Sequence, residues 1–525
     1  MTLSPNWLAA PIVIPMLTAA LSLAFTRWNR RTAAKRQRNL AAIAIGLNLA
    51  VALLLLVYTL SGNRLVLQMG GWAAPFGITV IADGLTAILL TLTGLVAAAM
   101  LPFAVGTLDQ RERMSFYPLM LFLLMGVNGA YLAGDLFNLY VFFEVLLMSS
   151  FVLLTLGGQA GQINGGIRYV VLNLVASVLF LAAAGLAYGA LGTLNMAHLA
   201  LRIPQAPVAV QTLLAGLLLI AFSSKAALFP LFFWLPSSYH TPHPVVTAFF
   251  GGLLTKVGIY ALFRTFTLLF PLYLVQWQSL LLTIAGLTML TGVLGALAAN
   301  TMRRVLSFQI ISQVGYMVMG LGLAGSSDAT LASFGMAAGI FYLIHHMVVE
   351  VALLMVGGAT ELEVMSGSLL QRRLGGLMGR RPALAVIFFV AAFALAGMPP
   401  TSGFVSKLSL LQSALQNGNY VIAGVSLLVG ALTLVSMARL WQHGFWGKAT
   451  EPIYPTAPLS SVSGRWLTLT PIAALLTLSL TIGLYSAPFF RWSSTAAQQV
   501  LDRQGYIQAV APTDEIHFMG GDAHD

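Results

Sequence analysis

Four ionisable side chains lie inside apolar stretches of this sequence, where a charge is unfavourable. The lysines are Lys225 in LLLIAFSSKAALFPLFFWLP, Lys256 in FFGGLLTKVGIYALF and Lys407 in TSGFVSKLSLLQSAL, and the carboxylate is Glu144 in LYVFFEVLLMSSFVLLTL. Each charge costs roughly 2.5–3.5 kcal/mol at the centre of a bilayer on insertion scales. Together they cost on the order of 10 kcal/mol, comparable with the whole stability of an ordinary protein. Such residues need partners or water, and their usual role is to move protons or ions.

Glu144 is expected near the middle of its span. It follows Asp135, which we expect at the outer end of that span, by nine residues. At about 1.5 Å per residue this is roughly 13 Å, close to the midplane of the hydrocarbon core. A lone carboxylate at this depth stays protonated, whereas a carboxylate beside an ammonium group stays charged. We expect Lys225 to be that partner, and the alternative is a static ion pair that only joins two helices.

Prolines interrupt two of the spans that carry these lysines. Pro230 follows Lys225 by five residues, and its missing N–H group breaks the helix. Pro399 and Pro400 interrupt a later span just before Lys407. Irregular backbone at membrane depth is tolerated only where protein or water surrounds it. Two broken spans, one in each half of the chain and each with a lysine, are typical of the repeats of a transporter.

Histidines could extend a proton route between the lysines. His345 and His346 lie within the apolar run FYLIHHMVVEVALL, where a histidine either relays protons or only hydrogen-bonds a neighbouring helix. Consecutive helix residues point about 100° apart, so only one of the two faces a given route. His240 and His243 follow the first broken span and are interpreted as a proton port, since their spacing without a carboxylate is weak evidence for a metal site. Glu350 is a further buried acid whose partner is not readable from the sequence.

The composition places the whole chain in a membrane. Of its 525 residues, 58% are hydrophobic and only 8% are charged, well below the proportion in soluble domains. Apolar runs of about twenty residues recur from Trp7 to Leu484, and we interpret them as about fourteen spans. Such continuous runs must be α-helices, because each backbone group has to be hydrogen-bonded within its own span. We therefore expect an all-α polytopic membrane protein.

Basic residues predict the orientation of the spans. The loop after the first span and four later arginine pairs all fall on one side when about fourteen spans are counted. They are Arg27, Arg30, Arg31, Lys35, Arg36 and Arg38, followed by Arg111/Arg113, Arg303/Arg304, Arg372/Arg373 and Arg380/Arg381. The positive-inside rule then places both termini outside, including the polar tail after Arg491. This bias accounts for most of the net charge of +11, so the charge does not indicate binding to nucleic acid.

Several kinds of chemistry are excluded by what the sequence lacks. There is no cysteine, which excludes iron–sulfur clusters held by thiolates and thiol catalysis. There is also no glycine-rich loop that ends in Gly-Lys-Ser/Thr, so the chain does not resemble an ATPase. We expect no cofactor, no resident metal and no enzymatic reaction of its own. The energy for transport must then come from an ion gradient or from a partner.

Three motifs together resemble one family. They are WLPSSYHTPHPVVTAFFGGLLTKVGIYALFR, RRVLSFQIISQVGYMVMGLGL and GMPPTSGFVSKLSLLQ. They are similar to the antiporter-like membrane subunits shared by respiratory complex I and the multisubunit Mrp (Mnh or Pha) cation/proton antiporters, over roughly residues 80–440. The run LLTKVGIYALFR most resembles the D subunit of the Mrp type.

The resemblance implies a fold and a set of site residues. It implies about fourteen helices with two inverted five-helix repeats, each with a broken helix, at 115–269 and 275–440. A three-helix segment at 1–114 precedes them, and a last span with a polar tail at 441–525 follows. The proton relay of the family matches Glu144, Lys225, Lys256, His345 or His346, and Lys407 in this sequence. Glu350 departs from the lysine or neutral residue that the resemblance leads us to expect.

The leading hypothesis is a subunit of a Na⁺ or K⁺/proton antiporter in a bacterial inner membrane, assembled with other membrane subunits. An alternative is the proton-pumping arm of a redox enzyme such as complex I or a membrane-bound hydrogenase, driven by a partner with cofactors. A stand-alone secondary transporter is a third interpretation. The sequence leaves open the choice between Na⁺ and K⁺, the cation path and which histidine faces the relay.

Overall fold

Long apolar helices make up most of the protein. The computed structural model describes residues 3–28, 30–72, 76–364, 376–446 and 462–510. Among these residues, thirteen helices are long and apolar enough to cross a membrane. One more span is divided into α17 (Pro382–Ala396) and α18 (Ser402–Gln416). The helical membrane fold and the count of about fourteen spans are thereby confirmed, while Arg372 and Arg373 lie outside the described residues.

Short connections join most of the helices of the first half of the chain. Their bounds are α1 Ala10–Trp28, α2 Arg30–Leu60, α3 Gly84–Thr107, α4 Gln110–Leu132, α5 Leu136–Leu154, α6 Ala160–Leu191, α7 Met196–Arg202, α8 Val208–Ala226, α9 Trp234–Ser238 and α10 Pro244–Leu268. Three of these helices begin at an aspartate whose side chain accepts hydrogen bonds from backbone N–H groups. These are Asp83 before α3, Asp109 before α4 and Asp135 before α5. Asp135 thus begins the fifth span, as expected.

The second half of the chain continues the same pattern. Besides α17 and α18, its helices are α11 Pro271–Gln276, α12 Gln278–Ala298, α13 Met302–Leu323, α14 Ala329–Val364, α16 Leu377–Arg380, α19 Tyr420–Trp441, α21 Val462–Leu484, α22 Ser486–Leu501 and α23 Arg503–Val510. A π-helical turn extends α19 over Gln442–Trp446. Single 3-10 turns cover Pro5–Ala9, Met69–Gly71 and Ile203–Gln205.

One small β-hairpin departs from the all-helical expectation. Strand β1 (Leu65–Gln68) pairs antiparallel with β2 (Thr79–Ala82), with Leu65 opposite Ala82. Both strands have four residues, too short for a clear alternating pattern in the sequence. The 3-10 turn near the N-terminus and α23 near the C-terminus both pack against this hairpin. Both described ends of the chain therefore lie at the same end of the molecule.

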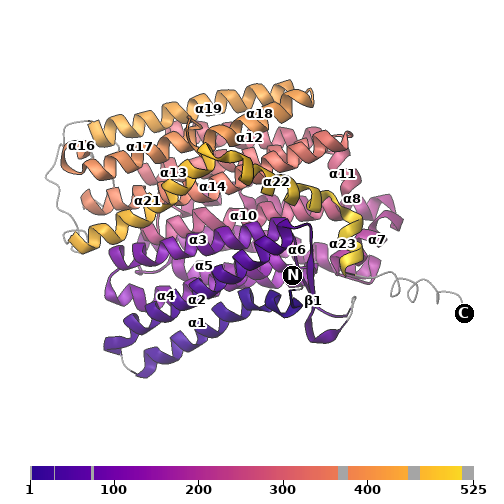
Figure 1. The fold of residues 1–525 in the computed structure, drawn as a ribbon, viewed down its shortest axis with the longest axis horizontal. Coiled ribbons are helices and arrows are strands. Elements are labelled where there is room, and N and C mark those ends of the chain that lie inside the picture. Colours follow the sequence, from indigo (N-terminus) through magenta and orange to yellow (C-terminus); the bar gives the residue numbers. More distant parts are fainter. Residues whose placement is uncertain (1–2, 29, 73–75, 365–375, 447–461, 511–525) are drawn as a thin grey trace, which may run out of the picture.

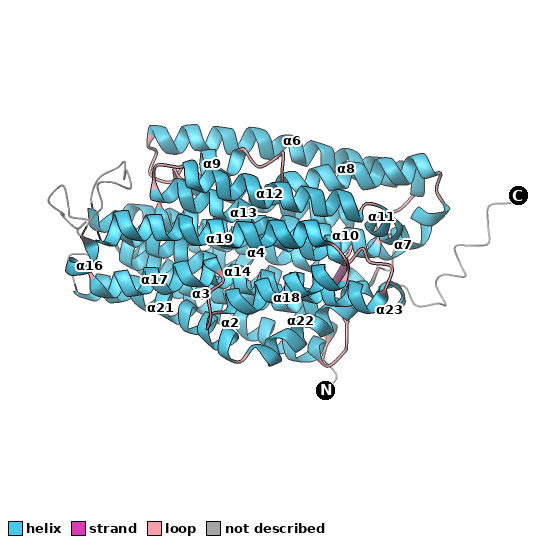
Figure 2. Cartoon of the chain, turned by 90° about the horizontal axis from the view of Figure 1, so that it is seen from above, coloured by secondary structure: helices cyan, strands magenta, loops and turns pink. Residues whose placement is uncertain are grey.

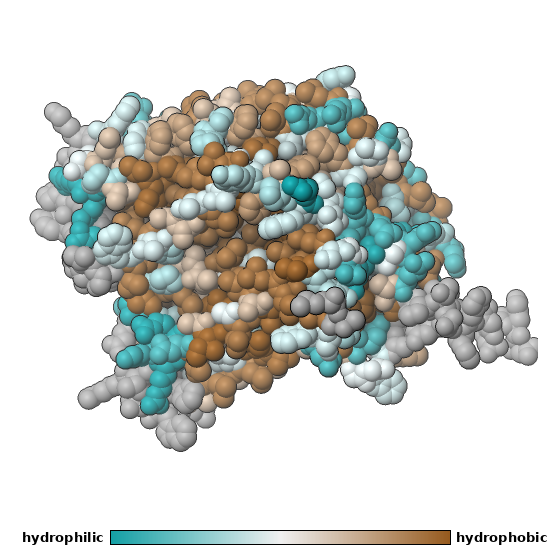
Figure 3. All heavy atoms as spheres, in the orientation of Figure 1, coloured by the Kyte–Doolittle hydropathy of each residue, from teal (hydrophilic) through white to brown (hydrophobic). Residues whose placement is uncertain are grey.

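The long helices lie side by side along the long axis of the molecule (Figures 1 and 2). The short elements gather at the two ends, with α16 at one end and β1, α7, α11 and α23 at the other (Figure 1). An apolar surface covers the middle of the face shown in Figure 3, and hydrophilic residues gather towards its ends. This distribution suits a protein whose belt faces lipid hydrocarbon.

Two helices form the centre of the bundle. All the residues of α10 are buried, and so is the membrane-spanning window of α14. Helix α14 packs against α10 and α13, against both parts of the broken span α17–α18, and against α3, α21 and α22. Because both helices are surrounded by protein, their few charged side chains lie within protein and not against lipid.

One direct ion pair joins α10 to α3. The Arg264 Nη2 atom lies 2.6 Å from Asp83 Oδ2, and both side chains are almost completely buried. The guanidinium also lies over the rings of Tyr260 and Tyr506, at 5.5 Å and 5.3 Å from their centroids. Burial alone would raise the pKa of Asp83, but the charge of Arg264 and the Thr86 N–H group outweigh it and hold that pKa below its usual value. Asp83 is therefore charged at neutral pH, and the pair stabilises the fold throughout the physiological range.

We expect Arg264→Gln to destabilise the protein by about 3–5 kcal/mol, because Asp83 is left charged and unpaired in a buried site. The double variant Arg264→Gln/Asp83→Asn should recover most of that loss, since asparagine still caps α3 without a charge. Thermal unfolding of the purified complex measures both variants. Equal instability of the single and double variants would show that the two charges do not act as a pair.

Candidate functional site

The first broken helix has a well-defined end. Helix α8 stops at Ala226, Ala227 adopts a left-handed conformation with φ of 60°, and the N–H group of Leu228 bonds to the carbonyl of Ser223 at 2.9 Å. The indole Nε1 of Trp234 donates to the carbonyl of Ser224 at 2.9 Å. The peptide bond before Pro230 is cis, and α9 begins four residues later. Pro230 thus lies in the irregular segment between α8 and α9.

The second broken helix repeats this arrangement. Helix α17 stops at Ala396, Gly397 has φ of 87°, and the Met398 N–H group bonds to the Phe393 carbonyl at 3.0 Å. The Pro399–Pro400 bond is cis, and α18 begins two residues after Pro400, at Ser402. The left-handed residue, the six-residue hydrogen bond and the cis-proline fall at matching positions in the two breaks. Pro399 and Pro400 thus lie in the irregular segment between α17 and α18.

Lys407 reaches back from α18 to the end of α17. Its Nζ donates to the carbonyls of Leu395 and Ala396 at 2.9 Å and 3.1 Å, and lies 5.1 Å from the centre of the Tyr316 ring. The last carbonyls of a helix carry partial negative charge and have no partner within the helix, so an ammonium group is stabilised there. A pocket of about 260 Å³, lined mainly by apolar side chains, adjoins Lys407 and Gly397.

Lys225 and Glu144 lie near each other without touching. The Lys225 Nζ donates to the carbonyl of Asn173 and to Ser177 Oγ on α6, at 3.2 Å and 2.9 Å. Glu144 is close enough to act on Lys225 electrostatically, yet no ion pair within 4 Å includes it among the described residues. The direct pairing expected from the sequence is therefore absent, because α6 supplies neutral oxygens that the sequence did not reveal. Glu144 is only partly buried, on a side of α5 where Val141 and Met148 are exposed.

A second group of charged residues lies between α10 and α14. Lys256 is fully buried and its Nζ donates to the carbonyl of Gly251 on the same helix. Glu350 on α14 acts on it electrostatically. The Nε2 atom of His346, one turn before Glu350, lies 3.4 Å from its Oε2 atom. Three titratable groups thus share one buried region at the centre of the bundle.

The two adjacent histidines face different parts of the protein. His346 faces Glu350, whereas His345 Nδ1 lies 2.7 Å from Ser402 Oγ at the start of α18. Ser402 is also hydrogen-bonded to Ser479 of α21 at 2.7 Å. The ring of Tyr342 lies beside both imidazoles and stacks on Tyr316, whose ring faces Lys407. Polar and aromatic side chains therefore run from the Lys256 region to Lys407.

His240 and His243 lie between α9 and α10. His240 Nδ1 lies 2.8 Å from the carbonyl of Pro236, and His243 caps α10 by accepting from the Val245 N–H group at 3.4 Å. Burial first, and then the positive charge of Arg303, lowers the pKa of His243 to about 3. Burial and nearby arginines also lower the pKa of His240. Both are neutral at physiological pH, and the capping contact explains His243 without a proton role, so the port stays a prediction.

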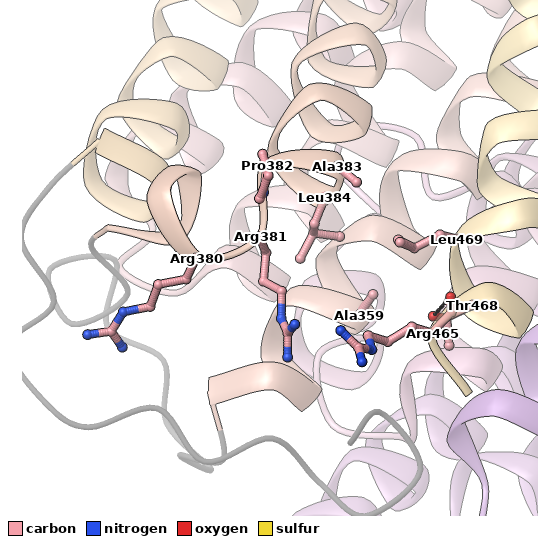
Figure 4. Close-up of a pocket in the computed structure, with 9 residues that line it drawn as sticks. All are labelled: Ala359, Arg380, Arg381, Pro382, Ala383, Leu384, Arg465, Thr468 and Leu469. Atoms are coloured by element: carbon pink, nitrogen blue, oxygen red, sulfur yellow. Dashed lines mark hydrogen bonds between the residues drawn. The ribbon is translucent and has the colours of Figure 1, made fainter. Parts of the chain in front are cut away.

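A basic pocket lies apart from these residues, at the ends of α14, α17 and α21 (Figure 4). It has a volume of about 270 Å³ and is lined by Ala359, Arg380, Arg381, Pro382, Ala383, Leu384, Arg465, Thr468 and Leu469. None of the expected relay residues lines it. Within the described part of the chain, no cluster of three or more histidine, aspartate or glutamate side chains is suited to hold a metal ion.

Comparison with known proteins places the chain in a family. A profile described as NADH:quinone oxidoreductase/Mrp antiporter, TM matches residues 133–433. The chain is 41% identical to the D subunit of the Na⁺/H⁺ antiporter of Alkalihalophilus pseudofirmus, over 96% of this chain and 99% of the relative. The chain belongs to the NADH:quinone oxidoreductase/Mrp antiporter family. Its identity to the corresponding D subunit of the Na⁺/H⁺ antiporter of Bacillus subtilis is 38%, again over 96% and 99% of the two chains.

A solved structure of this family agrees with the fold. A chain in the structure of the Mrp complex from Dietzia sp. DQ12-45-1b superimposes with a TM-score of 0.88 at 32% identity, covering 97% of this chain and all of that chain. The residues matched by the family profile include those expected in the relay, namely Glu144, Lys225, Lys256, His345, His346 and Lys407. The expected resemblance to the Mrp-type D subunit is confirmed.

Sequence reasoning missed the polar face of α13. Gln309, Gln313 and Tyr316 recur at helical spacing within an apolar helix, and all three are buried. The Oε1 atom of Gln313 accepts a hydrogen bond from the hydroxyl of Tyr342. Polar residues three and four positions apart share one helix face, and that spacing was available in SFQIISQVGYMVMG as a signal. Ser402 gave no such signal, because its partners lie on distant helices.

We expect Gly397→Ala to destabilise the protein by about 1–2 kcal/mol, the cost of a left-handed conformation for a residue with a Cβ atom. That Cβ would also lie 2.7 Å from Lys407 Cδ and displace the ammonium group. The matched control is Ala227→Gly at the corresponding position of the first break, which should leave stability unchanged or slightly higher. Thermal unfolding of both variants checks this, and no loss in Gly397→Ala would contradict it.

Proposed function

We propose that this chain is a subunit of a multisubunit monovalent cation/proton antiporter, exchanging Na⁺ or K⁺ for H⁺, and that it carries the protons. The observation that carries the proposal is a set of three lysines, two buried and one partly buried, in apolar helices. Each bonds to neutral oxygens, in a chain whose relatives are named as D subunits of Na⁺/H⁺ antiporters. An ammonium group held by neutral dipoles can release its proton without leaving a charged partner uncompensated.

The proposed proton route runs from Glu144 and Lys225 through Lys256 and His346 to Lys407. Glu144 acts on Lys225 from a distance, so a change in the charge around Glu144 alters how strongly Lys225 holds its proton. His345, hydrogen-bonded to Ser402, would position the start of α18 and not carry the proton itself.

The arrangement of the breaks also supports an internal repeat. Five helices that end with α10, at 115–269, would correspond to five that end with α19, at 275–440. Their broken members, α8–α9 and α17–α18, share the same local geometry. The repeat bounds stay a proposal, as do the segments 1–114 and 441–525 that flank them.

We place the protein in a bacterial cell membrane, with both termini outside. It would exchange Na⁺ or K⁺ for H⁺ as part of a complex with other membrane subunits. The shared location of the two described ends beside the hairpin supports a common side for both. The arginines of α16 and the loop after it, at the opposite end of the molecule, suit the cytoplasmic side. A proton port at His240 and His243 would open on that side.

Glu144→Gln should abolish cation/proton exchange while the complex still assembles, because an amide cannot carry the switching charge. Inverted vesicles from an antiporter-deficient host, expressing the complete set of subunits, report exchange as collapse of a respiratory pH gradient on addition of NaCl or KCl. Glu112→Gln is the matched control, since Glu112 lies in the capping box of α4, where glutamine serves equally well. Wild-type exchange in an assembled Glu144→Gln complex would refute this role of Glu144.

Lys225→Arg should also stop exchange, because arginine keeps its positive charge and the hydrogen bonds to α6 but does not release a proton. The same vesicle assay measures the rate. A variant with normal exchange would show that Lys225 only provides a fixed charge. If the assembled wild-type complex responds to neither salt, the redox-driven pump of the same family becomes the better explanation.

A further inference from the structure

Glu350 is a buried acid that the relay described above does not use. Its side chain has no exposed surface, and it lies on α14 at the centre of the bundle. At about 1.5 Å per residue, Glu350 lies roughly 30 Å from the start of α14 and roughly 20 Å from its end. Its side chain therefore does not reach either end of the helix. Neither carboxylate oxygen accepts a conventional hydrogen bond from any described residue. A buried carboxylate without hydrogen bonds is energetically unfavourable, so its presence here calls for a functional explanation.

Charged and titratable groups surround Glu350 on several helices. Lys256 of α10 acts on it electrostatically, and His346 of its own helix lies 3.4 Å away. His345 and Lys407 act in turn on His346, and the hydroxyl-bearing ring of Tyr342 stacks beside that imidazole. Glu350 is the one carboxylate among the described groups that act on Lys256.

A purely structural ion pair has a different geometry in this same protein. Arg264 and Asp83 are in direct contact at 2.6 Å, and Asp83 also accepts a backbone hydrogen bond from Thr86. Glu350 and Lys256 form no contact within 4 Å, and the Lys256 ammonium group is bonded to a backbone carbonyl. The charges of Asp83 and Arg264 are in direct contact, whereas those of Glu350 and Lys256 act on each other without contact.

We propose that Glu350 is a further proton-binding residue, which accepts a proton from Lys256 and passes it to His346. This inference rests on the proposed function, since it adds one step to the same route. In the first transfer an N–H bond of the Lys256 ammonium breaks and an O–H bond forms on Glu350, leaving a neutral amine and a neutral carboxylic acid. The ammonium group leaves the Gly251 carbonyl, or a water molecule bridges the gap.

The second transfer goes to the imidazole. The O–H bond of Glu350 breaks and an N–H bond forms on His346 Nε2, which restores the carboxylate and gives an imidazolium ion beside it. The distance of 3.4 Å between those atoms needs only a small side-chain movement to reach hydrogen-bond length. His346 then lies within electrostatic range of Lys407, so its positive charge weakens the hold of Lys407 on its own proton.

The test compares Glu350→Gln, Glu350→Asp and Asp328→Asn in the complete complex, in inverted vesicles over a range of pH. Glutamine has the shape of glutamate but cannot bind a proton, whereas aspartate can. Asp328→Asn is the matched control, because Asp328 is an exposed residue that caps the start of the same helix, where asparagine caps equally well. Gel filtration of the solubilised complex measures assembly.

We expect Glu350→Gln to lower the exchange rate roughly a hundred-fold, on the scale of losing a proton-transfer group. Glu350→Asp should retain exchange with a shifted pH profile, and Asp328→Asn should match wild type. An infrared difference spectrum between acidic and alkaline pH should contain a carboxyl C=O band that Glu350→Gln lacks. If Glu350→Gln fails to assemble, Glu350→Asp is the test. A shifted pH profile and a shifted carboxyl band support proton binding at Glu350, and an unchanged profile and band contradict it.

Two failures are distinguishable. If the assembled wild-type complex exchanges neither Na⁺ nor K⁺ for protons, the proposed function is wrong. If the wild type exchanges cations but assembled Glu350→Gln keeps its rate, pH profile and infrared band, Glu350 is a structural residue and only this inference is wrong.

Discussion

A positive charge within the membrane must find oxygen atoms, and this constraint organises the interior of the protein. The three lysines within the apolar helices satisfy it with neutral acceptors: Lys225 bonds to Asn173 and Ser177, Lys256 to Gly251, and Lys407 to the end of α17. Backbone carbonyls stabilise an ammonium group by their dipoles and carry no net charge. Among the described residues, none of the three ammonium groups is in direct contact with a carboxylate, unlike Arg264, so a lysine can release its proton without breaking a direct ion pair.

The two breaks satisfy the same constraint by different means. In the first break the indole of Trp234 caps the end of α8, which leaves Lys225 free to bond to α6. In the second, Lys407 itself caps the end of α17. The backbone is alike in both, but the lysine precedes the first break and follows the second. The same local backbone geometry therefore accompanies a lysine in the helix before the break in one case and in the helix after it in the other.

The sequence was sufficient for features that depend on local chemistry. Proline identified both breaks, aspartate identified the start of the fifth span, and long apolar runs identified the spans. Contacts between distant segments were beyond it. The expected contact of Glu144 with Lys225 gave way to hydrogen bonds from α6, and the separate directions of His345 and His346 depended on α18 and α10. The sequence identified Glu350 as a buried acid, with His346 one helical turn away. It did not indicate that Lys256, on another helix, lies near Glu350.

The central position of α14 has a consequence for timing. A transporter that rocks one half against the other needs an interface along which the halves can slide, and such motions take microseconds to milliseconds. Here one buried helix packs against α10 of the first half, against the broken helix of the second, and against α3, α21 and α22. A helix packed against both halves opposes their rotation relative to each other. The proton transfers proposed above would then proceed in a nearly static frame by rotation of side chains, which is faster than rocking of the halves.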